Sequence, residues 1–265
     1  IIFGSSTNTS IKELYMAGLP AGIILGLALI IVAYVIGKRN GYVGERNAFS
    51  LKEFWLSFKD AIWALGTPII MVGGVFGGFF TPTESAVIAV VYALIIGMFV
   101  YKELKLKDLY GIFFDSARTT GNLLFIVANA ALFAYVMTIE NIPQTVVQSL
   151  TSITENPILL LLIINLILLV AGAIMETIAI IIVMVPLFMP IVEMIGMDPV
   201  VFGVIVIVNT AIGMVTPPFG LCLLTASSIA KIGMEKTLKH AGIFIAASIF
   251  VLLLITYIPD LVTIF

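Results

Sequence analysis

The sequence predicts an all-α polytopic membrane protein, and three observations carry this prediction. The 265 residues are 61% hydrophobic and only 11% charged, whereas soluble domains carry about 25% charged residues. Apolar runs of about 18–25 residues recur along the chain, and each is long enough to cross a bilayer. One of these runs is interrupted by the motif Gly213–Gly220, which contains two consecutive prolines.

The same composition argues against several classes of protein. The net charge is −2, so nothing indicates a nucleic-acid partner. The apolar composition instead predicts contact with the lipid bilayer. Cys222 is the only cysteine, so neither a disulfide framework nor a thiolate metal cluster is expected. His240 is the only histidine and no phosphate-binding loop is present, so we do not expect an enzyme.

The first part of the chain alternates apolar spans with polar stretches. It opens inside an apolar segment without a methionine, and we therefore expect it to be the later part of a longer protein. A span covers 17 to about 36, and the polar stretch after it contains an amphipathic helix over 51–62 with Trp55 at the headgroup level. Residues 62–101 are too long for one crossing; two crossings, or two half-helices around a break at 77–86, both fit.

The second part repeats this alternation with more interruptions. Two prolines at 217 and 218 end any helix that reaches them, so we expect a hairpin there. The expected elements are an amphipathic arm helix over 104–118, a span over 122–138, two short spans or a broken pair near 172–176, the hairpin over 200–230 and a last span over 241–257.

Charge predicts the orientation of the loops. No Lys or Arg occurs between Thr119 and Ala230. The positive-inside rule therefore places two stretches in the cytoplasm and two outside: 37–60 and 102–118 in the cytoplasm, and 140–156 and 192–199 outside. Three lysines also place 231–240 in the cytoplasm, which conflicts with a hairpin over 200–230 that would return to the outside.

The Thr-Pro-Pro break is the strongest candidate for a binding site. Because proline has no backbone N–H, the carbonyls of Gly213 and Met214 are expected to lack helical partners. Irregular backbone at membrane depth survives only where it is buried in protein or lines a site. Free carbonyls beside the Thr216 hydroxyl suit a sodium ion, as at the ion sites of secondary transporters. The alternative is a proline kink that only shapes packing.

Other polar groups in apolar surroundings are candidates for lining a substrate or ion site. Thr81, Thr83 and Glu84 form a second break, which is either a capped turn between spans or part of a site. Glu176 is expected at membrane depth, where an acid is costly and either functional or bonded to neighbouring helix ends.

Two asparagines, Asn165 and Asn209, lie in apolar runs. They either join helices through hydrogen bonds or line the site.

A weak internal repeat suggests how the chain is organised. Ile11–Gly18 aligns with Glu235–Gly242 through shared Lys, Leu, Ala and Gly residues. We therefore expect two repeats, the end of the first over 1–101 and the second over 102–265, as in many transporters.

Five stretches, taken together, resemble the large membrane subunit of TRAP (tripartite ATP-independent periplasmic) transporters. They occur in the family's order and span nearly the whole chain: Ala17–Gly22, Gly77–Ala86, Gly172–Ala179, Asp198–Gly203 and Gly213–Gly220. The family subunit is longer, so the chain corresponds to about its later three-fifths.

The resemblance implies a sodium-coupled, elevator-type carrier of the ion-transporter superfamily in the bacterial inner membrane. It implies inverted repeats, broken helices and helical hairpins, and a sodium site at Gly172, Gly213, Thr216 and Phe219. It also implies a small membrane subunit and a periplasmic binding protein as partners. The substrate class is an organic carboxylate such as a C4-dicarboxylate or sialic acid.

Two alternatives remain open from the sequence. One is an ion-coupled carrier of the same superfamily that works without a binding protein. The other is a membrane-arm subunit of a proton-pumping complex, which would need charged relays across the membrane centre. No Lys or Arg lies in any expected span, which argues against the second alternative.

Overall fold

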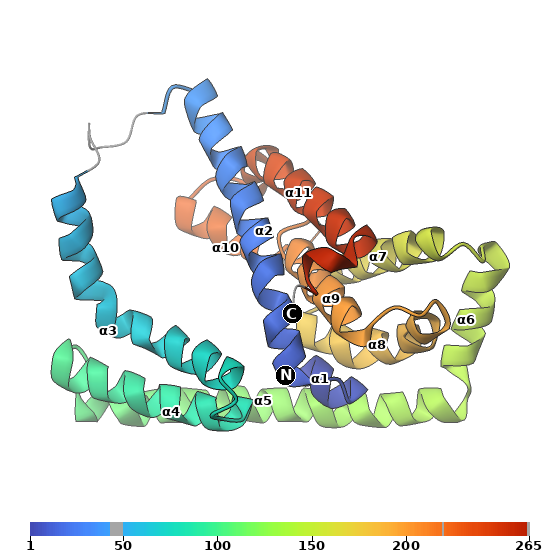
Figure 1. The fold of residues 1–265 in the computed structure, drawn as a ribbon, viewed down its shortest axis with the longest axis horizontal. Coiled ribbons are helices and arrows are strands. Elements are labelled where there is room, and N and C mark those ends of the chain that lie inside the picture. The colour runs from blue at the N-terminus through green and yellow to red at the C-terminus, as the bar shows by residue number, and fades with distance from the viewer. Residues whose placement is uncertain (43–49, 219, 264–265) are drawn as a thin grey trace. The chain divides into compact units, whose positions relative to one another are not determined.

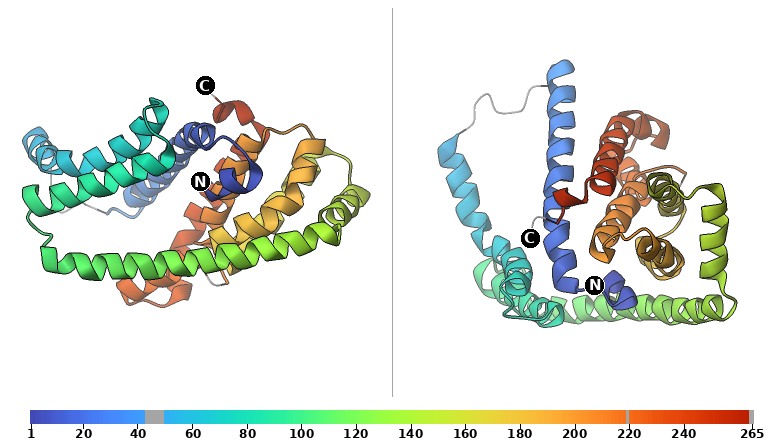
Figure 2. Two further views of the ribbon diagram at one scale, coloured as in Figure 1. Left: turned by 90° about the horizontal axis from the view of Figure 1, so that it is seen from below. Right: turned by 45° about the vertical axis from the view of Figure 1, so that its right-hand side comes forward.

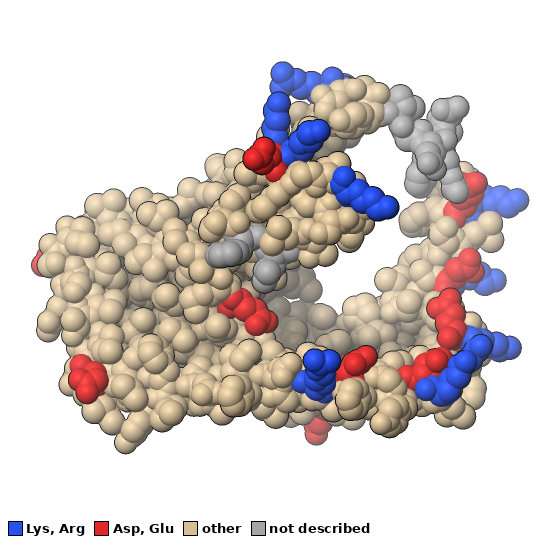
Figure 3. All heavy atoms as spheres, turned by 180° about the vertical axis from the view of Figure 1, so that it is seen from behind, with Lys and Arg blue, Asp and Glu red and all other residues tan. Residues whose placement is uncertain are grey.

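The computed structural model describes residues 1–42, 50–218 and 220–263, and all regular elements among them are helical (Figure 1). Within these ranges, seven helices are long and apolar enough to cross a membrane. On the face drawn in Figure 3, most of the surface belongs to uncharged residues. The prediction of an all-α polytopic membrane protein is therefore confirmed.

The described residues form eleven α-helices and two short helices of other types, η1 and η2. In chain order their bounds are α1 Ile2–Thr7, α2 Ile11–Arg39, α3 Leu51–Phe76, α4 Pro82–Ile95, η1 Ile96–Val100, α5 Leu106–Ile139, α6 Ile142–Ile153, α7 Pro157–Ile174, α8 Thr177–Met194, α9 Pro199–Gly213, α10 Leu221–Ala230, α11 Met234–Tyr257 and η2 Pro259–Leu261.

The chain divides into two compact units. One comprises 1–39 and 126–265, and the other comprises 40–125. Helix α5 contributes to both units. This division reflects compactness rather than sequence repetition, so the two repeats expected over 1–101 and 102–265 stay a prediction.

In the smaller unit, α3 and α4 fold back on each other around residues 77–81. Three hydroxyl groups from α4 and the residue after η1 donate to α3 backbone carbonyls at 2.6–3.0 Å, in antiparallel order: Ser85 to Ile70 and Met71, Tyr92 to Trp63, and Tyr101 to Asp60. Of the two arrangements left open for 62–101, the structure therefore has two complete helices side by side.

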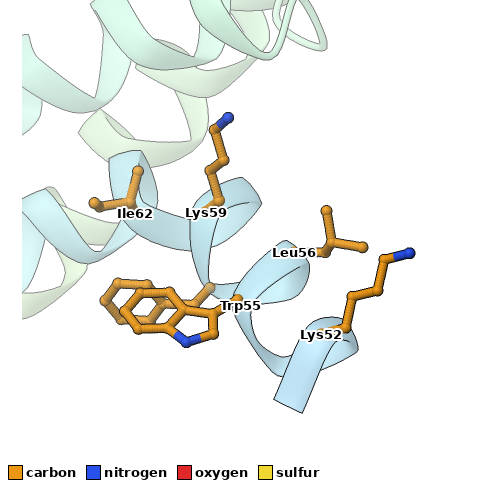
Figure 4. A pocket seen from close by; sticks show the side chains of 6 residues that line it. Lys52, Trp55, Leu56, Lys59 and Ile62 are labelled. Carbon is orange, nitrogen blue, oxygen red and sulfur yellow. The ribbon is translucent and has the colours of Figure 1, made fainter. Parts of the chain in front are cut away.

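Each expected arm helix is continuous with the span that follows it. Residues 51–62 form the first half of α3, where Lys52, Leu56 and Lys59 follow one another along the helix (Figure 4). Residues 104–118 overlap the start of α5, which runs unbroken for 34 residues (Figure 2). No proline lies between arm and span in either case. Gly121 lies between the two parts of α5, but a single glycine does not end a helix. At 1.5 Å per residue α5 is about 51 Å long, well beyond the roughly 30 Å of a bilayer core.

Helix α9 is the most buried element of the larger unit. Its side chains belong to two apolar clusters: Phe202 and Val206 pack with α7 and α8, whereas Val201 and Ile205 pack with α2 and α11. The Asp198 side chain accepts from the Val200 N–H at 2.7 Å and caps the first turn. The helix that ends at the Pro-Pro motif is therefore held from all sides.

The segment 199–230 is a broken helix rather than the expected hairpin. Helix α10 meets the start of α11, where Ser227 Oγ donates to Thr237 Oγ1 at 2.9 Å. The other end of α11 lies near the start of α9, since Val262 beyond α11 packs in one cluster with Val200. Residues 199–230 therefore run the length of α11 in the opposite direction.

This path removes the conflict over orientation. The ends of a broken crossing lie on opposite sides of the membrane, so 192–199 can be outside while 231–240 is in the cytoplasm. The fold-back occurs one step earlier, where α7 ends and α8 begins. Helix α8 returns to pack against α6, the helix that precedes α7.

Candidate functional site

The first break of the larger unit lies between α7 and α8. Met175 has extended backbone angles and Glu176 is the N-cap of α8, without a capping bond from its side chain. The Glu176 carboxylate is exposed on this chain. Exposure on the chain alone does not test the expected membrane depth. Glu176 stands at the break between α7 and α8, and both its depth in the membrane and its role in lining a site stay predictions.

The second break comprises residues 214–220, between α9 and α10. Its carbonyls are not left without partners, as the prolines suggested: Gly213 O accepts from the Thr216 N–H at 2.9 Å, and Met214 O accepts from the Cys222 N–H at 3.0 Å. The chain turns tightly after α9, so amides outside the helix reach these carbonyls. Each carbonyl oxygen has a second lone pair, which keeps it a possible ion ligand.

Thr216 is half-buried at this break and is oriented by its own helix. Its Oγ1 donates to Ile212 O at 2.7 Å. Because the hydroxyl proton is used in this bond, the oxygen lone pairs face away from it and can accept or coordinate. Phe219, the fourth expected sodium position, lies outside the described residues.

The two breaks meet through a contact between glycine backbones. A methyl group added at Gly213 would lie 2.5 Å from the Cα and the carbonyl carbon of Gly172, and one added at Gly172 would lie 3.1 Å from Gly213 Cα. Both glycines are buried. A second contact lies one step further on, where Thr177 Oγ1 is 3.5 Å from Met214 Sδ. The structure thus brings together Gly172 and Gly213, which are far apart in sequence.

This junction collects helix ends of both polarities. The C-terminal ends of α7 and α9 carry partial negative charge from their last carbonyls, and the N-terminal ends of α8 and α10 carry partial positive charge. Gly220 enters α10 with φ 46°, a conformation that glycine adopts most easily. Such a junction can hold a cation at the carbonyl ends and an anion at the amide ends without a charged side chain.

Asn209 joins helices through hydrogen bonds, and its role in lining a site stays a prediction. It is fully buried, and its Nδ2 donates to Asn165 Oδ1 at 2.8 Å and to the Asn165 carbonyl at 3.1 Å. Asn165 in turn donates to Thr256 Oγ1 of α11 at 3.1 Å. Sequence reasoning left the role of the asparagines open and missed Thr256, whose only signal was a hydroxyl within the last apolar span.

The remaining candidates form the turn before α4 in the smaller unit. Glu84 Oε2 accepts from the Thr81 N–H and hydroxyl, both at 2.8 Å, and the Glu84 N–H donates to Thr81 Oγ1 at 3.3 Å. These reciprocal bonds form a capping box. Thr83 and Glu84 also border a shallow hollow of about 340 Å³. The capped-turn alternative thus accounts for Thr81 and Glu84, and a site role for the three residues stays a prediction.

Sequence comparison shows which known proteins the chain is similar to. Residues 1–261 match the family model described as the tripartite ATP-independent periplasmic transporter, DctM component. The isethionate TRAP transporter permease protein DctMQ of Oleidesulfovibrio alaskensis is 40% identical over 98% of the chain and 41% of its own length. The C4-dicarboxylate TRAP transporter large permease protein DctM of Pseudomonas aeruginosa is 37% identical, and the sialic acid TRAP transporter large permease protein SiaM of Vibrio cholerae is 35% identical. Both matches cover 98% of the chain, which spans 60% and 61% of those two relatives.

Proposed function

The chain belongs to the DctM component family of tripartite ATP-independent periplasmic transporters, whose members are multi-pass membrane permeases rather than enzymes. On this premise we propose that the protein carries out sodium-coupled uptake of a small organic carboxylate. The proposed location is the bacterial inner membrane. The substrate class is that of the relatives' names, which include C4-dicarboxylates and sialic acid.

The observation that carries the proposal is the contact between Gly172 and Gly213. It sets the carbonyl ends of α7 and α9 against each other, with the Thr216 hydroxyl three residues beyond Gly213. Backbone carbonyls at facing helix breaks are the ligands that secondary transporters use for sodium. In the proposed site, Gly172, Gly213, Thr216 and Phe219 supply the oxygens.

The same junction supports coupling between ion and substrate. Sodium at the carbonyl ends would neutralise their partial negative charge and order the 214–220 segment. A carboxylate would bind next to the amide ends of α8 and α10. Each ligand would then favour binding of the other, and this mutual stabilisation is the coupling free energy of symport.

Two partners follow from the proposal. A tripartite transporter needs a small membrane subunit and a periplasmic binding protein that delivers the substrate, and we propose both for the full-length protein. An elevator-type movement of the larger unit, with inverted repeats, is part of the same proposal.

The test is uptake of labelled carboxylates into proteoliposomes that contain the full-length protein with its small subunit and binding protein. Uptake should require an inward sodium gradient. Thr216→Ala should raise the half-saturating sodium concentration about tenfold, which corresponds to a loss of about 1.4 kcal/mol of binding free energy.

Thr138→Ala is the matched control. Thr138 Oγ1 donates to the carbonyl four residues earlier at 2.8 Å, the same local bond that Thr216 makes, but on α5. Its sodium dependence should equal that of the wild type. Uptake that ignores sodium, or a Thr216→Ala variant that behaves like Thr138→Ala, would refute the proposed ion site.

A further inference from the structure

A buried polar cluster ties together three helices of the larger unit. Asn165 of α7, Asn209 of α9 and Thr256 of α11 are 4%, 0% and 1% exposed. Asn209 donates to Asn165, and Asn165 donates to Thr256. The Thr256 hydroxyl donates a hydrogen bond to Leu252 O at 2.8 Å. The chain of donors therefore runs in one direction from α9 through α7 to α11.

The orientation of the Asn209 amide is determined by its neighbours. Its Nδ2 faces two acceptors, the side-chain and backbone oxygens of Asn165. Turning the amide over would place oxygen against oxygen, so the nitrogen must face Asn165. The cost is that Asn209 Oδ1 is buried without a hydrogen-bond partner among the described residues. Burying an amide oxygen without a partner costs free energy, so this orientation gives a defined pairing at some expense of stability.

The cluster lies on the two helices whose ends form the proposed ion site. Asn209 precedes Gly213 by four residues, about 6 Å along α9, and Asn165 precedes Gly172 by seven residues, about 10 Å along α7. Helices α7 and α9 are thus joined at two levels, by the amide bonds and by the glycine contact. Glycine backbones in contact can pivot and slide, whereas a pair of directional hydrogen bonds determines the relative register.

Resting on the function proposed above, we infer that the Asn165–Asn209–Thr256 cluster is a positioning device for sodium binding. It holds α7 and α9 in the register at which the carbonyls of both helix ends converge on one ion. None of the three side chains is itself a sodium ligand in this proposal. Helix α11 takes part through Thr256 and, next to it, through Tyr257 Oη, which donates to the Ile158 carbonyl at the start of α7 at 3.0 Å.

The decisive variant is the pair Asn165→Leu with Asn209→Leu. Leucine has the same branching as asparagine. Replacing both amides leaves neither partner buried and unpaired, and it also removes the unpaired Asn209 Oδ1. The pair should therefore keep the thermal unfolding temperature of the wild type or raise it. Its half-saturating sodium concentration should nevertheless rise by roughly 10-fold or more, as when groups behind the ligands of a metal site are removed.

The measurement combines sodium titrations of uptake with thermal unfolding, using the full-length protein and its partners. Uptake at saturating sodium should stay close to that of the wild type, because the ligands themselves remain. A second pair, Asn165→Ala with Asn209→Ala, covers the case in which leucine is too large. Ser248→Ala is the control, since this buried hydroxyl of α11 bonds only to Phe244 of its own helix among the bonds assigned to it, and its sodium dependence should not change.

The outcomes separate the two proposals. Wild-type uptake that depends on sodium, with an unchanged half-saturating concentration in both paired variants, would overturn the positioning role and leave the proposed function intact. The same follows if the paired variants lose stability and maximal uptake together while sodium affinity stays constant. Sodium-independent uptake by the wild type would overturn both.

Discussion

Two interruptions of the helical backbone, one in each unit, contain similar residues but differ in what their backbone contacts. The turn before α4 and the break after α9 both combine threonine and proline beside glycine-rich sequence. The turn at Thr81 is closed by its own neighbour, because Glu84 takes the free N–H and hydroxyl of Thr81. The break after Gly213 instead lies against another helix end, at Gly172.

The difference teaches how to distinguish a structural turn from a candidate site. A turn that satisfies its polar groups locally and meets no second helix break needs no ligand and tells little about function. A break whose backbone is pressed against a second break brings the carbonyl ends of two helices together, so that their partial negative charges add, even where single carbonyls accept a nearby N–H. Partnering at a distance, rather than the presence of proline, is the informative property.

The largest effect is expected from Gly213→Ala. The new methyl group would lie 2.5 Å from Gly172 backbone atoms, which have no rotamer by which to move away. We expect destabilisation of about 1–3 kcal/mol and loss of most sodium-dependent uptake. Thermal unfolding and proteoliposome uptake measure the two effects.

Two further glycine variants test whether the effect follows the closeness of the backbone contact. Gly172→Ala places its methyl group 3.1 Å from Gly213 Cα and should have a smaller effect in the same direction. Gly242→Ala, which meets nothing within 4 Å, should leave uptake unchanged. Equal behaviour of Gly213→Ala and Gly242→Ala would show that the helix ends are not in contact in the working protein.

A moderate effect on stability alone is expected from Thr81→Ala. The variant removes the hydroxyl of the capping box and should cost about 1 kcal/mol of folding free energy. The half-saturating sodium concentration should stay at the wild-type value, because the turn satisfies its own polar groups. Thr83→Ala, at the second residue of α4, is the control for stability. A marked rise in the sodium requirement of Thr81→Ala would instead assign this turn to the site.

The smallest effect is expected from Tyr92→Phe. The variant removes one hydroxyl bond, 2.8 Å long, to the Trp63 carbonyl within the α3–α4 hairpin. Single side-chain bonds between helices in membranes contribute about 0.6 kcal/mol on average. A slight decrease in unfolding temperature with normal uptake is therefore the expected result. A large loss would mean that the hairpin depends on this bond more than its ladder of three hydroxyls suggests.

Much of the fold could be read from local sequence. The spans, the pair of short helices around 175–176 and the break after Gly213 follow from apolar length, proline and glycine, and the structure contains all three. The boundaries of the arm helices could not be read in this way. Polarity changes within α3 and α5, but a change of polarity alone does not end a helix, and α3 continues even through Pro68.

The candidate site was only partly predictable. Gly172 and Gly213 were expected together because of the family resemblance, and their backbone contact is what the structure adds. The prediction that the prolines leave free carbonyls was wrong, because amides beyond α9 donate to the carbonyls of Gly213 and Met214. The sequence left two roles open for the asparagines, and the structure adds the hydrogen bonds by which they join α7, α9 and α11.

The sequence by itself determined that this protein crosses a membrane as helices and where those helices break. These are local consequences, because backbone amides buried in lipid must be satisfied within the segment and proline cannot take part. Only the tertiary structure decided that 199–230 continues along α11 instead of turning back, that Asn209 faces Asn165, and that two glycines bring separate breaks together. Small and apolar residues are compatible with many neighbours, so the choice among them depends on the packing of the whole unit.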